Sequence, residues 1–163
     1  MGVSKLTTFQ QKQVAAAQGY LELGMVSDAL AELRQLPEAV VNEPLVLELQ
    51  VLILIRAKRW KAAKTAASKL CAVSPEDGSG YMHLAFCQHE LGDTKGARKT
   101  LLGGPRSLEK MATYYYNLAC YEAVLGQVEA ARVYLEQSIR IDKRFRDFAK
   151  YDVDLAALHG EMV

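Results

Sequence analysis

Four alanines recur at equal intervals in this chain of 163 residues, at Ala29, Ala63, Ala97 and Ala131. A fixed period of this length, about 34 residues, is typical of stacked helical hairpins. A small residue that returns at one position of every unit indicates that two helices approach each other closely there. The alanine period therefore predicts an all-α solenoid, a class whose usual work is to hold another protein chain. It does not identify that chain.

The position five residues before each alanine also repeats, and it holds Gly24, Lys58, Gly92 and Gly126. Glycine suits a helix that ends in a left-handed cap, because it has no Cβ to clash in that conformation. Lys58 departs from this pattern. We therefore expect the turn at Lys58 either to be strained or to use a different cap.

Two segments carry the motif aromatic-x-x-Leu-Ala, followed by glycine and then by alanine five residues later. They are residues 81–85 with Gly92 and Ala97, and residues 115–119 with Gly126 and Ala131. This pattern resembles the tetratricopeptide repeat. The resemblance implies a right-handed superhelix of four helical hairpins in a single domain over residues 1–163. The repeats would cover residues 10–42, 44–77, 78–111 and 112–142, with a capping helix over residues 143–160.

Capping residues and prolines predict where the helices begin and end. Thr7 or Thr8 would cap the first helix, Ser27 the second and Ser107 the seventh. Asn42 would cap the third helix, with Pro44 in its first turn. The fourth and eighth helices are expected at residues 60–73 and 128–141. The second helices of repeats one and three are expected to be shorter than those of repeats two and four.

Charge and composition narrow the class of function. The formal net charge is +1, which predicts binding to neither nucleic acid nor membrane surfaces. The longest apolar stretch, residues 45–55, contains Glu48 and Gln50, and it is shorter than the roughly 20 residues that span a bilayer. The segment Met1–Gln13 lacks the apolar run of a signal peptide. The three cysteines have no short paired spacing, so we expect a protein of the reducing cytoplasm.

The sequence offers little that resembles a catalytic centre. Its histidines are not at metal-ligand spacing, and it contains no glycine-rich phosphate loop or nucleophile elbow. Asp152 and Asp154 form an acidic pair without a further acidic ligand, and helix capping explains such a pair more simply. We therefore expect neither an enzyme nor a cofactor, a metal or a small-molecule substrate.

The resemblance places the functional surface on the concave face, which the first helix of each hairpin lines. Most residues at these positions are apolar, as expected for a surface that binds a partner. The alternative is that the superhelix is tight or the tail folds back, so that these residues belong to the core. The candidate groove residues are Leu52, Arg56, Met82, Phe86, His89, Tyr116 and Cys120.

The expected partner is another protein, which offers a peptide or helix with apolar side chains to the groove. The module would then be a scaffold or a chaperone-like adaptor. Two alternatives stay open. The chain could be a structural subunit that forms homo-oligomers. Less favoured is a nucleic-acid binder that uses the basic run of repeat two, whose cations are Arg56, Lys58, Arg59, Lys61, Lys64 and Lys69.

The C-terminal segment resembles the closing segment of many bacterial tetratricopeptide proteins, in which an Asp-x-Asp-Leu turn follows the last hairpin. Here that motif is residues 152–155. Cationic and acidic residues alternate with apolar ones in the amphipathic pattern of a cap. We expect the cap to pack on the last helix of repeat four and to bury its apolar residues, Phe145, Phe148, Tyr151, Val153, Leu155 and Leu158.

Overall fold

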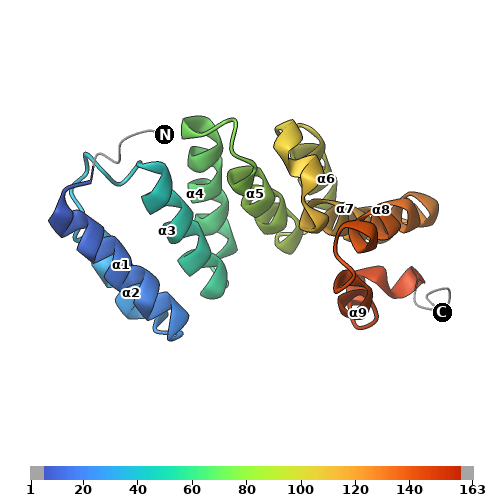
Figure 1. Cartoon of the computed structure of the whole chain (residues 1–163), viewed down its shortest axis with the longest axis horizontal. Helices are drawn as coiled ribbons and strands as arrows, with labels where there is room; N and C mark the ends of the chain where they lie inside the picture. Colours follow the sequence, from blue (N-terminus) through green and yellow to red (C-terminus); the bar gives the residue numbers. More distant parts are fainter. Residues whose placement is uncertain (1–5, 159–163) are drawn as a thin grey trace. The chain divides into compact units, whose positions relative to one another are not determined.

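The computed structural model describes residues 6–158, which form helices and contain no β-strand. This confirms the expected all-α class. The chain divides into two compact units, of which the first ends at Pro75 and the second begins at Glu76. Each unit contains two pairs of adjacent helices (Figure 1).

Unit 1 is built from α1 (Thr8–Glu22), α2 (Val26–Arg34), α3 (Pro44–Arg56) and α4 (Trp60–Val73). Helices α1 and α2 pack together as one pair, and α3 and α4 form the other. The pairs meet where α3 contacts both α1 and α2. Helix α3 is apolar on most sides, and six of its side chains are buried, from Val46 to Leu54.

Unit 2 contains α5 (Gly78–Glu90), α6 (Thr94–Leu102), a 3-10 helix (Arg106–Lys110), α7 (Ala112–Val124) and α8 (Val128–Ile141). Helices α5 and α6 form one pair, and α7 and α8 form the other. The hydroxyl of Ser138 on α8 donates a buried hydrogen bond of 2.9 Å to the carbonyl oxygen of Ala112. This bond fixes the C-terminal half of α8 against the start of α7.

The four alanines of the repeat are fully buried, each with 0% exposure. Each lies in the first half of the second helix of its pair. A larger side chain at these positions would have to push the two helices of the pair apart. The alanine period therefore correctly predicted positions that are buried within the packed pairs of helices.

Each pair is joined by the same kind of turn. In all four turns the residue at the glycine position has a positive φ: 75° at Gly24, 54° at Lys58, 84° at Gly92 and 78° at Gly126. The amide of the following residue donates to a carbonyl five residues back, as in the bond from Arg59 to Leu54 of 2.9 Å. This is the Schellman cap. Lys58 thus adopts the same cap as the glycines, in a conformation that costs a side-chain-bearing residue about 1–2 kcal/mol.

Several predicted boundaries are confirmed and others are wrong. Thr7 caps α1 in a capping box with Gln10, and α4 and α8 occupy residues 60–73 and 128–141 as expected. However, α2 is capped at Met25 rather than Ser27. Similarly, α3 is capped at Glu43 rather than Asn42, although Pro44 is its first residue. Ser107 lies in the separate 3-10 helix, and α7 begins only at Ala112.

The second helices alternate in length as predicted, with 9 residues in α2 and α6 and 14 residues in α4 and α8. A proline closely follows each short helix, Pro37 after α2 and Pro105 after α6, and Pro75 likewise follows the long helix α4. Proline cannot continue a helix, because it has no N–H and its ring clashes with the preceding turn. The units therefore share one plan, in which a short second helix is followed by a long one.

The tail, residues 143–158, differs from the single capping helix that the sequence predicts. It forms a five-residue helix, α9 (Phe145–Ala149), and a 3-10 helix, η2 (Val153–Leu158). It packs chiefly on α7, through η2, and only lightly on α8. The prediction that the tail packs mainly on α8 is therefore wrong. Val133 of α8 is 63% exposed. The last predicted cap residues, 159 and 160, lie outside the described residues.

Candidate functional site

The predicted groove residues fall into two groups according to unit. Leu52 and Arg56, on α3 of unit 1, are exposed. The other five lie on α5 and α7 of unit 2. Met82 and Cys120 are buried there, at 8% and 5% exposure, whereas Phe86, His89 and Tyr116 are half-buried.

The tail accounts for part of this difference, because η2 packs on α7 and reaches His89 of α5. The hydroxyl of Tyr116 donates a hydrogen bond of 2.7 Å to Asp152 Oδ2. The thiol of Cys120 donates to the same oxygen over 3.7 Å. On α5, Nε2 of His89 lies 3.0 Å from Asp154 Oδ2. Three of the predicted groove residues therefore contact the chain's own C-terminal segment.

Local contacts hold both partners of these bonds in position. The amide of Asp154 donates to Asp152 Oδ1 over 3.0 Å, which caps the start of η2 and confirms the predicted capping role of Asp152. The other ring nitrogen of His89, Nδ1, lies 3.0 Å from the hydroxyl of Thr94. The ring of His89 also packs against Tyr121, with 4.9 Å between the ring centroids.

Apolar contacts surround this polar cluster. Leu155 and Leu158 of η2 are buried to 0% and 2% exposure, and Ala149 of α9 to 0%. The ring of Phe145 lies against Tyr116 with a centroid separation of 4.9 Å. The face that the first helices of unit 2, α5 and α7, form is its first-helix face. It thus holds the tail through the two buried leucines and the two hydrogen-bonded carboxylates of the tail.

The opposite side of the tail corrects the sequence prediction. Phe148, Tyr151 and Val153 are exposed by 59%, 86% and 83%, instead of being buried as expected. Phe148 and Tyr151, with Tyr116, line a shallow hollow of about 540 Å³ beside Asp147 and Asp152. Amphipathic spacing predicted that the tail has an apolar face, but the irregular stretch between α9 and η2 changes which residues form it.

Burial sets the protonation of the groups under the tail. It raises the pKa of the Cys120 thiol strongly, and the carboxylates of Asp152 and Asp154 add to the shift. Burial and the hydrogen bond to Asp152 likewise raise the pKa of Tyr116. Both groups are therefore protonated near neutral pH, as hydrogen-bond donors to Asp152 must be.

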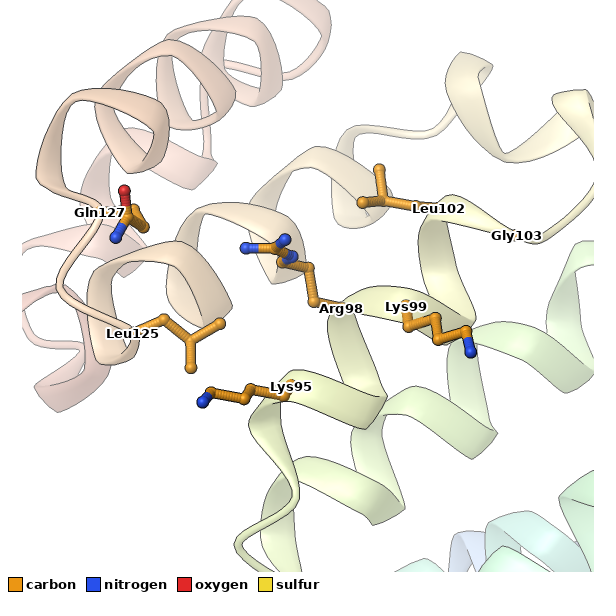
Figure 2. A pocket seen from close by; sticks show the side chains of 7 residues that line it. All are labelled: Lys95, Arg98, Lys99, Leu102, Gly103, Leu125 and Gln127. Carbon is orange, nitrogen blue, oxygen red and sulfur yellow. The ribbon is translucent and has the colours of Figure 1, made fainter.

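A second concave feature, which the sequence did not predict, lies in unit 2 between α6 and the turn that joins α7 to α8. Figure 2 shows Lys95 and Arg98 extending from α6 toward the segment that carries Leu125 and Gln127. The cleft between them has a volume of about 730 Å³. Its further lining residues are Lys99, Leu102 and Gly103. Arg98 reaches across to α7, where it pairs with the buried Glu122 at 3.2 Å.

Unit 1 has a hollow at the matching place, beside its own short second helix. It has a volume of about 550 Å³ and is lined by α2, α3 and α4. Arg59 and Lys69 of the basic run line it together with apolar residues that include Leu30 and Leu33. Of the six cations of that run, five are exposed and Lys64 is half-buried. These side chains are spread over a solvated face.

Comparison with models of protein families gave no match, and comparison with curated proteins gave none either. Among the described residues, the helices are all too short or too polar to cross a membrane. The fold and the surfaces define this chain as an all-α protein of paired helices.

Proposed function

We propose that the chain is a non-enzymatic protein-interaction module of four tetratricopeptide-like hairpins, which binds a partner segment on the first helices of unit 1. One observation carries the proposal. In unit 2 the equivalent face already holds a short segment, namely the tail. The contacts of the tail indicate which kind of segment such a face accepts: one with apolar side chains to bury and carboxylates to hydrogen-bond.

The repeat register relates the two faces residue by residue. Residues that are two alanine periods apart occupy equivalent positions in the two units. Leu52 is therefore equivalent to Cys120, and Leu21 to His89. In the same way, Ile55 is equivalent to Ala123. Unit 1 therefore presents leucine in place of Cys120 and His89, and Glu48 in place of Tyr116. A segment bound there gains mainly from apolar burial, about 25 cal/mol for each Å² removed from water.

Arg56 adds charge selectivity at the end of this face. It follows Leu52 by one helical turn, so both side chains lie on the same side of α3. Leu52 is 38% exposed and Leu45, two turns further back along the same side, is 54% exposed. The partner we infer is an apolar helix or extended peptide with an acidic residue near Arg56, which steers its approach. Such a protein would serve as a scaffold or a chaperone-like adaptor.

Affinity capture from native cells with matched variants tests this function. Leu52→Glu replaces the apolar centre of the unit 1 face, and Val133→Glu makes the same change at an exposed position of α8. We expect the wild-type chain and Val133→Glu to recover the same partner and Leu52→Glu to lose it. Circular dichroism of both variants should match the wild type, because both sites are exposed.

Two outcomes would count against the proposal. Equal capture by Leu52→Glu would show that the partner binds elsewhere, such as in the cleft of Figure 2. The other outcome is that light scattering shows the wild-type chain to be an oligomer, and that the Leu52→Glu substitution dissociates this oligomer into monomers. In that case the unit 1 face would bind a second copy, and the structural-subunit alternative would replace the adaptor.

A further inference from the structure

The fold brings together three side chains with metal-binding donors from distant parts of the sequence. Cys120 comes from α7, and Asp152 and Asp154 come from the start of η2 in the tail. The Cys120 sulfur and one carboxylate oxygen from each aspartate all lie within 4.8 Å of one another. We call these three residues the tail cluster. The sequence alone indicated only the acidic pair, because the cysteine belongs to an earlier helix far from it along the chain.

One spacing within the tail cluster is close to that of a tetrahedral zinc site, and all three donor atoms lie within 4.8 Å of one another. Zinc binds sulfur at about 2.3 Å and carboxylate oxygen at about 2.0 Å, which places these two ligand atoms about 3.5 Å apart. The Cys120 sulfur lies 3.7 Å from Asp152 Oδ2. A cation between the three donors would therefore draw them together from separations of at most 4.8 Å, a movement of about 1 Å at the most distant pair.

Both aspartates are already oriented by contacts outside the tail cluster. Tyr116 donates to Asp152 over 2.7 Å, and His89 approaches Asp154 to 3.0 Å. His89 is itself held by Thr94, at 3.0 Å. Hydrogen bonds of this kind to ligating carboxylates position them and raise metal affinity. The ion would leave these three contacts in place. The only bond that it would replace is the one between Cys120 and Asp152.

Charge favours an ion at the same point. The two carboxylates carry two negative charges beside a buried thiol, and Cys120 is only 5% exposed. A divalent cation that replaces the thiol proton reduces the net charge of the cluster from −2 to −1. Sulfur and oxygen together are donors that suit zinc and related transition metals, whereas calcium and magnesium prefer oxygen alone.

We propose that the tail cluster binds one divalent cation of the zinc class through Cys120 Sγ and a carboxylate oxygen each of Asp152 and Asp154. The fourth position is left to water. On binding, the Cys120 thiol releases its proton to solvent and one metal–sulfur bond forms, with no change of oxidation state. The ion fastens the tail to α7. This proposal does not rest on the partner proposed for unit 1.

Cobalt titration of the full, untagged and reduced chain tests the site, with Co²⁺ as the spectroscopic probe. We expect a sulfur-to-cobalt charge-transfer band in the near ultraviolet that saturates at one ion for each chain. Cys120→Ser should abolish this band. Cys71→Ser and Cys87→Ser are the matched controls and should retain it, because neither thiol belongs to the tail cluster. Burial raises the pKa of each of these two thiols to about 11.

Asp154→Asn gives a second, independent readout, since it leaves the sulfur in place. We expect it to weaken cobalt binding at least about tenfold, because even changes to the outer-shell partners of metal ligands cost about 10–100-fold in affinity, while the charge-transfer band still appears at saturation. Circular dichroism confirms that each variant is folded. The proposal fails if the wild-type chain shows no thiolate band, if the band persists in Cys120→Ser, or if Asp154→Asn binds cobalt as tightly as the wild type.

Discussion

At the scale of single residues, the four turns between paired helices show what a side chain costs in free energy at a position with positive φ. Glycine occupies three of them and Lys58 the fourth, all with positive φ and the same pair of cap hydrogen bonds. The cap is therefore imposed by the packing of the helices on either side. Lys58 adopts it although its own backbone preference opposes it.

Lys58→Gly should stabilise the chain. Relief of the left-handed strain contributes about 1–2 kcal/mol, and the greater flexibility of glycine in the unfolded chain offsets about 0.5–1 kcal/mol of that. We expect a net gain of about 0.5–1 kcal/mol in urea denaturation. Gly92→Ala, at the same position of another pair, is the opposite control and should lose about 1 kcal/mol. A loss of stability in Lys58→Gly would show that Lys58 makes compensating contacts.

At the scale of elements, the tail shows why part of this structure was beyond sequence analysis. The alanine period placed the paired helices, and two of them matched to the residue. Capping residues were less reliable, as Ser27 and Asn42 show, because the turn geometry decides where a helix starts. The period says nothing of the tail, which lies outside the repeats. Only tertiary contacts reveal that His89, Tyr116 and Cys120 lie under it.

Two substitutions in the tail separate its buried side from its exposed side. Leu155→Ala should destabilise unit 2 by about 2–5 kcal/mol, because Leu155 is fully buried and its loss leaves a cavity. Phe148→Ala should change stability by less than about 0.5 kcal/mol, because that ring is mostly exposed. Urea denaturation of the full chain measures both. Equal effects would mean that the tail packs through a different face from the one described.

At the scale of the whole molecule, one plan is used twice with different surfaces. Both units pair a short and then a long second helix with two first helices. In unit 2 the first-helix face has polar groups that hold the tail. In unit 1 the equivalent positions hold Leu21, Glu48 and Leu52, and Leu52 and Arg56 remain exposed. The central claim is that unit 1 uses this face for a partner, as unit 2 uses its own for the tail.

Site-specific photocrosslinking in the native cell tests that claim most directly. A photoreactive side chain placed at position 52 would lie on the unit 1 face, and one placed at position 133 would lie on exposed α8. We predict a discrete adduct with another protein from position 52 and none from position 133. The account would be contradicted if position 133 gave an adduct and position 52 gave none. It would also be contradicted if both positions gave the same adducts.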